Sequence, residues 1–177
     1  MKANIKKEIA SWAKTIAFSV LLAVFINKVL IVNAMVPTGS MEGNIMADDR
    51  IVASRLSYIF SAPKRFDIVV FRYPDDRSTL YVKRIIGLPG ETLSIRQGKV
   101  YIGDSAEPLD DSFVPEPPRL EDSGPYIVPA DSYFMMGDNR NCSADSRYWT
   151  NKFVARSEIL GKALLRYYPG FHLLYSK

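Results

Sequence analysis

The segment Ile9–Ile26 constrains the fold of this chain more than any other feature. It reads IASWAKTIAFSVLLAVFI, about 18 residues in which Lys14 is the only charge. This length is near the lower limit for a helix that crosses a hydrocarbon core about 30 Å thick. Lys14 and Lys28 can extend their side chains to the membrane interface, where Trp12 also fits well. We therefore predict a single transmembrane helix over residues 9–28.

Basic residues near this segment predict its orientation. Four lysines stand before it or in its first turns: Lys2, Lys6, Lys7 and Lys14. Because basic residues gather on the cytoplasmic side of membrane spans, residues 1–8 are expected in the cytoplasm. Residues 29–177 are then expected on the external face of the cell membrane, periplasmic or extracellular.

Two other interpretations of the apolar segment stay open at this point. A cleaved signal peptide needs a cleavage site with small residues, and Val32-Asn33-Ala34 is a poor one. A buried amphipathic helix needs a polar face, and residues 16–26 are apolar on every side except at Ser19.

Beyond residue 29 the pattern becomes that of a mainly β domain, which we predict as an antiparallel sheet or barrel-like fold. Short runs rich in Val, Ile, Phe and Tyr alternate with Gly, Pro and Asp, and Gln97-Gly98 suits a hairpin turn. Gly103–Pro125 holds five prolines and is expected to be a surface excursion or a small inserted subdomain. Strands are expected at 29–35, 50–54, 67–72, 80–88, 92–96, 99–102, 126–128, 133–137 and 161–168, with a short turn or helix at 154–159.

Composition excludes several classes of function. The net charge of +4 is modest, and the Lys and Arg residues are scattered without interleaved aromatic platforms, so no nucleic-acid partner is expected. The single cysteine, Cys142, excludes an internal disulfide framework. The lone His172 excludes a His-rich metal site. We expect no metal and no cofactor.

Ser40 stands in the run Val36-Pro37-Thr38-Gly39-Ser40-Met41, just beyond the apolar segment. A small hydroxyl between Gly39 and Met41 is compatible with a turn serine and with a nucleophile held at a membrane surface. A nucleophilic serine needs a base to take its proton. The usual base is histidine, and His172 in the C-terminal tail is poorly placed for that role.

Lys83 is the alternative base. It lies in the strand-like run Tyr81-Val82-Lys83-Arg84-Ile85, where burial would lower the pKa of its amine from about 10.4. Strand alternation puts Tyr81 and Ile85 on its face, and the neighbouring Arg84 would further disfavour a charged amine. A solvated lysine on an edge strand remains the other interpretation.

A third polar run, residues 137–149, is dense in hydrogen-bonding side chains and predicts a structured loop. Asp145 and Arg147 have the charges for a bidentate pair. The loop is either an outer layer of polar groups that orients the base or an acidic ion-binding loop. Its spacing does not match an EF-hand.

Together these runs resemble the bacterial type I signal peptidases (leader peptidases), which are membrane-anchored Ser/Lys endopeptidases. The resemblance covers nearly the whole chain and follows the family order. It includes the anchor, the serine run, Asp49-Arg50-Ile51-Val52, Asp67-Ile68-Val69-Val70-Phe71, the lysine run through Glu91 and the Gly137–Arg147 run.

The resemblance implies a role for each matching residue. Ser40 matches the nucleophile and Lys83 the general base. Thr38 matches the residue whose hydroxyl joins the Ser40 backbone N–H in the oxyanion hole, and Ser143 matches the hydroxyl that orients the lysine amine. A supporting polar cluster is matched by Arg84, Asp145 and Arg147. The implied fold is largely antiparallel β, with a short inserted subdomain at about 92–130.

The implied activity is removal of signal peptides from exported preproteins after small residues at the minus-three and minus-one positions. The implied partners are these peptides and membrane lipid. A dedicated processing peptidase for one secretion or pilus substrate, and a non-catalytic peptide-binding module, are the alternatives.

The chain departs from the family pattern near the nucleophile and elsewhere. Gly43-Asn44 replaces the common Pro-Thr, and Phe66 replaces a usual glycine. Cys142 replaces a common Asn and Thr150 a common Gly. None of these changes removes a catalytic group, but Gly43-Asn44 can alter the rigidity of the loop that carries Ser40.

Overall fold

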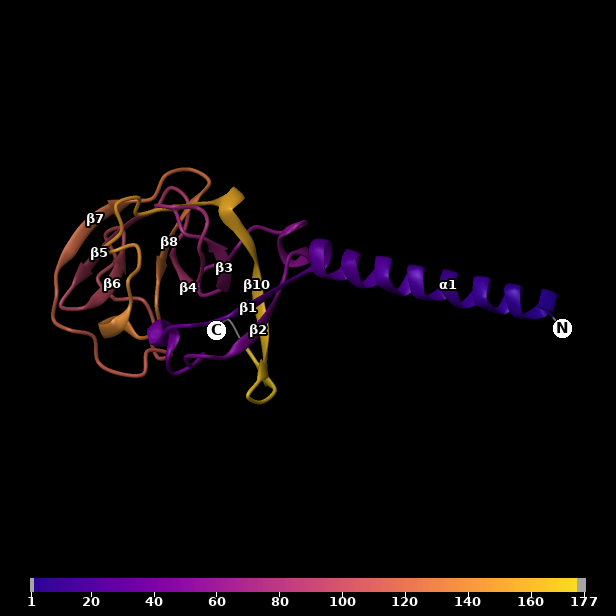
Figure 1. Ribbon diagram of the computed structural model, residues 1–177. Coiled ribbons are helices and arrows are strands. Elements are labelled where there is room, and N and C mark those ends of the chain that lie inside the picture. Colours follow the sequence, from indigo (N-terminus) through magenta and orange to yellow (C-terminus); the bar gives the residue numbers. More distant parts are fainter. Residues whose placement is uncertain (1, 175–177) are drawn as a thin grey trace.

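A long N-terminal helix projects from a β body (Figure 1). The computed structural model describes the backbone of residues 2–174 and the side chains of residues 7–174. Met1 of the predicted cytoplasmic tail and residues 175–177 of the predicted β domain lie outside the described part. Helix α1 (Lys2–Phe25) continues through a π-helical turn, Ile26–Leu30. Lys7–Leu30 is 24 residues long, has no buried residue and is apolar enough to cross a membrane.

The main sheet of the body has eight strands and carries most of the chain. Its order is β1-β2-β10-β3-β4-β8-β9, and β11 pairs with β10. All the strand pairs in the described residues are antiparallel. The strands are β1 (Ile31–Met35), β2 (Arg50–Ser54), β3 (Ile68–Arg72), β4 (Leu80–Gly87), β8 (Ser132–Met136), β9 (Val154–Ala155), β10 (Ile159–Tyr168) and β11 (His172–Leu173).

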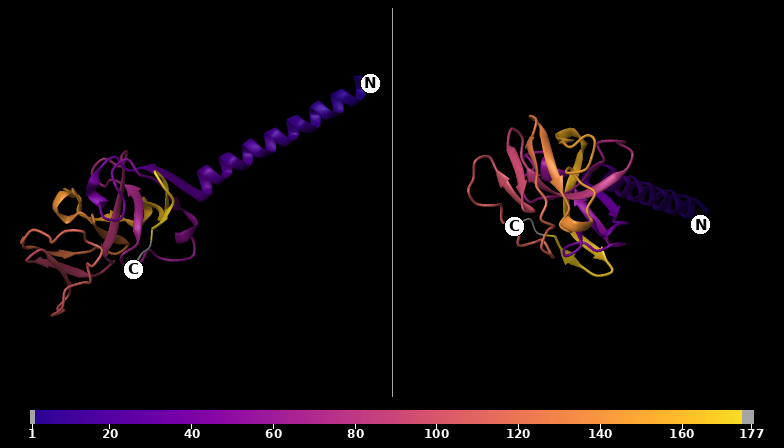
Figure 2. Two further views of the ribbon diagram at one scale, coloured as in Figure 1. Left: turned by 90° about the horizontal axis from the view of Figure 1, so that it is seen from below. Right: turned by 90° about the vertical axis from the view of Figure 1, so that its left-hand side faces the viewer.

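A second sheet is formed by the chain between β4 and β8. It has the order β6-β5-β7, with β5 (Thr92–Arg96), β6 (Lys99–Ile102) and β7 (Ser123–Ile127). Figure 1 and the left view of Figure 2 place it at the end of the body farthest from α1. Leu93 and Ile95 of β5 pack with Ile86 of β4 and Phe134 of β8, so an apolar cluster joins the two sheets.

Strand β3 explains why its sequence is a continuous apolar run. Ile68 and Val70 belong to one buried cluster, while Val69 and Phe71 belong to another. Because successive side chains of a strand point to opposite faces, both faces of the sheet are covered here. The neighbouring β4 is buried from Val82 to Gly87, so its side chains are enclosed on both faces as well.

The mainly β, antiparallel fold with one N-terminal apolar helix is confirmed, and most strand positions agree with the sequence prediction. Gln97 and Gly98 have φ of 49° and 76°, as a two-residue hairpin turn requires. Strand β1 begins at Ile31 because the helix runs on through its π turn. Strand β7 begins earlier than predicted, at Ser123. Strands β9 and β11 were not predicted, since two residues are too few to show alternation.

Gly161 in β10 offers a test of how tightly the sheet is packed. A Cβ there would lie 2.7 Å from the backbone oxygen of Ser54, so Gly161→Ala requires β2 or β10 to move. We expect it to lower the free energy of unfolding by about 1–3 kcal/mol in denaturant titrations. Gly170→Ala is the matched control, because no atom lies within 4 Å of its added methyl group. Equal stability of the two variants would contradict this packing.

Candidate active site

Ser40 is held on a short 3-10 turn, Gly39–Met41, in the connection 36–49 between β1 and β2, here called the Ser40 loop. The turn is fixed from outside by Asn139. The Asn139 backbone N–H donates to the Ser40 carbonyl at 3.1 Å, and Asn139 Nδ2 donates to the Gly39 carbonyl at 3.2 Å. Ser40 is only 5% exposed. Ser40 is therefore not a surface turn serine, because its side chain is buried and its turn is fixed by a distant part of the chain.

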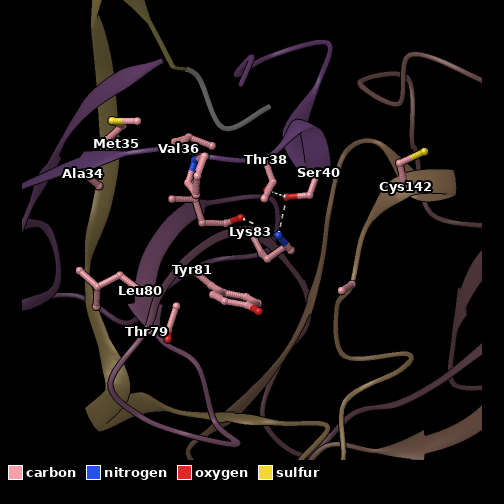
Figure 3. A pocket seen from close by; sticks show the side chains of 13 residues that line it. Ala34, Met35, Val36, Thr38, Ser40, Thr79, Leu80, Tyr81, Lys83 and Cys142 are labelled. Carbon is pink, nitrogen blue, oxygen red and sulfur yellow. Dashed lines mark hydrogen bonds between the residues drawn. The ribbon is translucent and has the colours of Figure 1, made fainter. Parts of the chain in front are cut away.

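Lys83 meets Ser40 from β4, where it is paired with Val69 of β3. Lys83 Nζ donates to Ser40 Oγ at 2.6 Å and to the Val82 carbonyl at 3.2 Å (Figure 3). Lys83 is 4% exposed. The interpretation of Lys83 as a solvated edge lysine is therefore wrong.

Burial lowers the pKa of the Lys83 amine to about 8, while Asp145 and Asp138 act in the opposite direction. Desolvation disfavours the charged ammonium, and nearby carboxylates favour it. The expected contribution of Arg84 is not found, because the Arg84 guanidinium is paired with Asp138. About a tenth of this amine is thus neutral at pH 7, far more than at the ordinary lysine pKa.

A cavity of about 230 Å³ opens beside this pair (Figure 3). Thr38 lies on its wall, and Thr38 Oγ1 donates to Ser40 Oγ at 3.3 Å. Most of the wall is apolar, and it is formed by two stretches of chain and a loop. They are Ala34–Thr38 with Ser40, Thr79–Lys83, and Cys142 with Ala144.

Ser143 does not form a hydrogen bond with the lysine amine in this structure. Its Oγ is buried and has no hydrogen-bond partner among the described residues. A Cβ at Gly137 would lie 2.3 Å from Ser143 Oγ and also 2.3 Å from the Ser40 carbonyl oxygen. Glycine at position 137 therefore lets the Ser143 loop approach the Ser40 loop closely.

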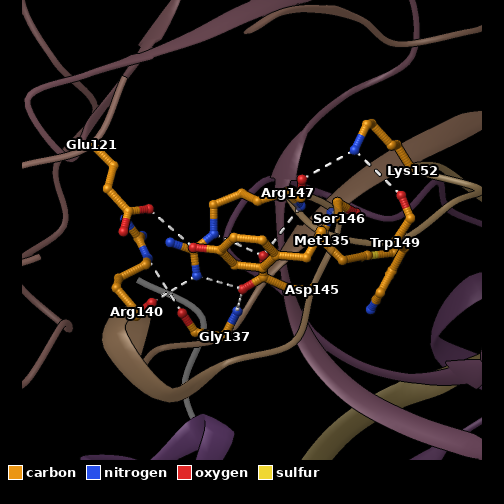
Figure 4. Close-up of polar contacts among 10 residues, drawn as sticks. Glu121, Met135, Gly137, Arg140, Asp145, Ser146, Arg147, Trp149 and Lys152 are labelled. Carbon is orange, nitrogen blue, oxygen red and sulfur yellow. Dashed lines mark hydrogen bonds and ion pairs between the residues drawn. The ribbon is translucent and has the colours of Figure 1, made fainter. Parts of the chain in front are cut away.

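Asp145 and Arg147 form the bidentate pair that the sequence predicts (Figure 4). Arg147 Nε and Nη2 donate to the two Asp145 oxygens at 2.8 and 2.9 Å. Asp145 Oδ2 also accepts from the Gly137 backbone N–H at 3.0 Å. Burial lowers the pKa of Arg147, but the hydrogen bond and charge of Asp145 outweigh it and the net shift is upward. The pair stiffens the loop that carries Ser143.

Arg84 belongs to a different pair, with Asp138. Arg84 Nε and Nη2 donate to the Asp138 oxygens at 2.7 and 2.6 Å, and both side chains are almost fully buried. Asp138 and Asn139 are site residues that the sequence reasoning did not single out. Their position in the same polar run as Ser143 was the available signal.

His172 stands apart from these residues. It lies exposed in β11, paired with Arg166, and is not among the residues that line the cavity. A Ser-His-Asp arrangement around Ser40 is therefore not formed.

Comparison with known proteins places the chain in a family. Residues 9–168 match the family described as signal peptidase, peptidase S26. A signal peptidase I of Leptolyngbya laminosa is 38% identical over 164 residues, covering 88% of this chain and 78% of that protein. A signal peptidase I of Bacillus amyloliquefaciens is 34% identical over 179 residues, covering 95% of this chain and 92% of the relative.

Among solved structures, a signal peptidase I of Enterococcus faecalis has 32% sequence identity and a TM-score of 0.49. The match covers 58% of this chain and 97% of the solved chain. The extent of the family match and the coverage of the two relatives are sufficient for assignment. The chain belongs to the signal peptidase family, peptidase S26.

The lowered pKa of Lys83 predicts how stability changes with pH. Below about pH 8 the amine is charged in both the folded and the unfolded protein, and burying this charge lowers the stability of the folded protein. Between about 8 and the ordinary value of 10.5 only the unfolded chain holds the proton, so stability rises with pH.

We therefore expect the stability of wild type relative to Lys83→Met to rise by roughly 1–3 kcal/mol across this window. Denaturant unfolding at several pH values measures this difference. A difference that does not change with pH would contradict a buried, titrating amine.

Proposed function

We propose that this protein removes signal peptides from exported preproteins through a Ser40 nucleophile and a Lys83 general base. The observation that supports this most strongly is the contact of 2.6 Å between Lys83 Nζ and Ser40 Oγ in a place nearly closed to water. Membership of the signal peptidase family supports the substrate class. A hydroxyl and a partly neutral amine at hydrogen-bond distance are what nucleophilic catalysis requires.

The proposed reaction uses this geometry. Neutral Lys83 takes the proton of Ser40 Oγ as that oxygen attacks the scissile carbonyl carbon. The former carbonyl oxygen, now the negatively charged oxyanion of the tetrahedral intermediate, accepts hydrogen bonds from the Ser40 backbone N–H and Thr38 Oγ1. Protonated Lys83 then gives its proton to the leaving amine, which leaves an acyl-enzyme ester. Lys83 next takes a proton from water, the hydroxide attacks the ester, and Ser40 recovers its proton.

Ser143 and the pair behind it are proposed to set the position of the amine. An unpaired buried hydroxyl is uncommon in folded proteins and needs an explanation. Ser143 Oγ is such a group. A hydrogen bond to Lys83 during the reaction provides the partner, while Asp145 and Arg147 hold the loop in place.

The cavity favours an extended peptide with small side chains. Its volume of about 230 Å³ is small, and apolar side chains form most of its wall. Two strand edges flank it. The first is the outer edge of β1, which is the end strand of its sheet. The second is the part of β4 before Arg84, because β8 pairs with β4 only from Arg84 onward in the described residues. A peptide can add to such edges as a further strand, and its small minus-three and minus-one residues would occupy the cavity.

The proposed topology follows the charges of the N-terminus. Residues 1–8 are proposed to lie in the cytoplasm, with 9–28 in the membrane and 29–177 on the external face. The segment at about 92–130 is proposed as an inserted β subdomain. With this proposed topology the cavity lies on the external side of the membrane, where the C-terminal end of a translocated signal peptide emerges.

Membrane lipid is proposed to contact the loop after β2. The Arg55 backbone N–H donates to the Leu30 carbonyl at 2.9 Å, so this loop starts at the end of the helix. Ile59 and Phe60 are 57% and 96% exposed there. Tyr58 and Leu174 are not part of this surface, because both side chains are buried. In the C-terminal tail, the exposed aromatic and apolar side chains that could also contact lipid are those of Tyr167, Tyr168, Phe171 and Leu173.

Cleavage of a preprotein by the full chain in detergent or liposomes tests this function. We expect Ser40→Ala and Lys83→Ala each to reduce cleavage to the background rate, because each removes a group that takes part in bond making. Far-UV circular dichroism verifies that the variants are folded. Retained cleavage by either variant would show the Ser40–Lys83 mechanism to be wrong, and binding of a signal peptide without turnover by wild type would favour a non-catalytic module.

A further inference from the structure

The excursion between β6 and β7 contacts the Ser40 loop through residues that do not line the cavity. A Cβ at Gly43 would lie 3.2 Å from Pro115 of this excursion, and Gly43 has a φ of 99°, which favours glycine. Asn44 Nδ2 lies 3.4 Å from the Phe113 carbonyl oxygen, to which it donates. Gly43 and Asn44, which replace the common Pro-Thr of the family pattern, therefore both meet the excursion.

Asn44 also connects the Ser40 loop to the buried pair beneath it. Its Nδ2 donates to Asp138 Oδ2 at 2.8 Å. The same carboxylate receives the bidentate hydrogen bonds of Arg84, the residue that follows Lys83 in β4. Asn139, next to Asp138, holds the Ser40 carbonyl. One continuous polar network thus links the nucleophile loop with the strand of the base.

Phe113 covers this network. Its ring centroid lies 4.2 Å from the Arg84 guanidinium carbon and 5.5 Å from the Phe66 ring centroid. Arg84 and Asp138 are 1% and 0% exposed, although both carry charges. Buried ion pairs depend on exact hydrogen bonding and on the exclusion of water. A ring stacked on the guanidinium excludes water from it and adds a cation–π attraction. On the same side, Asp111 Oδ2 lies 4.0 Å from Arg140 Nη1.

We propose that residues 111–115 of the excursion are a positioning element that fixes the Ser40 loop against β4, acting through Phe113, Asn44 and the Arg84–Asp138 pair. None of these residues lines the cavity. Their effect is therefore on the placement of Ser40 Oγ relative to Lys83 Nζ, and not on peptide binding. This inference depends on the proposed function, because it assumes that these two atoms react.

Phe113→Ala in the full chain is the first test. We expect kcat per folded enzyme to fall by about 10- to 100-fold, because small displacements of reacting groups have effects of that size. KM should change less than twofold, since the cavity wall is untouched. Phe113→Tyr keeps the ring and should keep most of the wild-type kcat. The matched control is Leu120→Ala, which truncates a side chain that is 76% exposed in the same excursion.

Asn44→Asp is a second variant that preserves the size of the side chain. It places a carboxylate where the amide now donates to Asp138, so like charges replace a hydrogen bond. We expect kcat to fall below that of Asn44→Ala, again with little change in KM. Near-UV circular dichroism supplies the folded fraction to which each rate is normalised.

The outcomes separate this inference from the proposed function. If Ser40→Ala retains cleavage, the proposed function itself is wrong. If Ser40→Ala is inactive but Phe113→Ala and Asn44→Asp both keep kcat within twofold of wild type, only the positioning role is overturned. A loss of kcat in Phe113→Tyr equal to that in Phe113→Ala would also overturn it, because the ring would then not be the relevant feature.

Discussion

A lysine amine in contact with a serine hydroxyl, in a place that water hardly reaches, is the interaction on which the rest of this structure depends. In water an amine with an ordinary pKa is almost fully protonated at neutral pH and cannot accept the proton of a hydroxyl group. Burial lowers the pKa of Lys83 to about 8, which makes a neutral amine available. The β body encloses Lys83, and the Ser40 loop closes over it.

Three separate parts of the chain have to meet for this contact to form. Strand β4 carries Lys83 between two covered faces of the main sheet. The Ser40 loop follows β1, the strand that continues from the helix. The polar run after β8 holds that loop through Asn139 and approaches it closely at Gly137. The buried pairs Arg84–Asp138 and Asp145–Arg147 hold this run in a defined shape.

Much of the fold was predictable from the sequence, because short apolar runs and turn residues mark the strands directly. The depth of Lys83 was not predictable from alternation, since β4 is buried on both faces and the spacing alone favoured a solvated lysine on an edge strand. The family resemblance selected Ser40 and Lys83, and the structure brings them together. The partner of Arg84 could not be inferred, because Asp138 is distant in sequence and several acids were available.

Phe66 shows a different limit of sequence reasoning. Its φ of 70° lies in the left-handed region, where the resemblance leads one to expect glycine. The backbone cost of that conformation is offset by a ring contact that a glycine cannot make. Its ring packs on Phe113, while its carbonyl accepts from Arg84 Nη1 at 2.8 Å. A case in which tertiary packing compensates for an unfavourable backbone conformation can be recognised only once the fold is known.

The pH dependence of kcat/KM for preprotein cleavage tests the shared role of Ser40 and Lys83 most directly, because it reports the pKa of the base in the free enzyme. The structure predicts a rate that rises with a pKa of about 8 and reaches a plateau above it. A rate that increases only as the pH approaches the ordinary lysine value, or a profile without any such step, would contradict Lys83 as the buried general base.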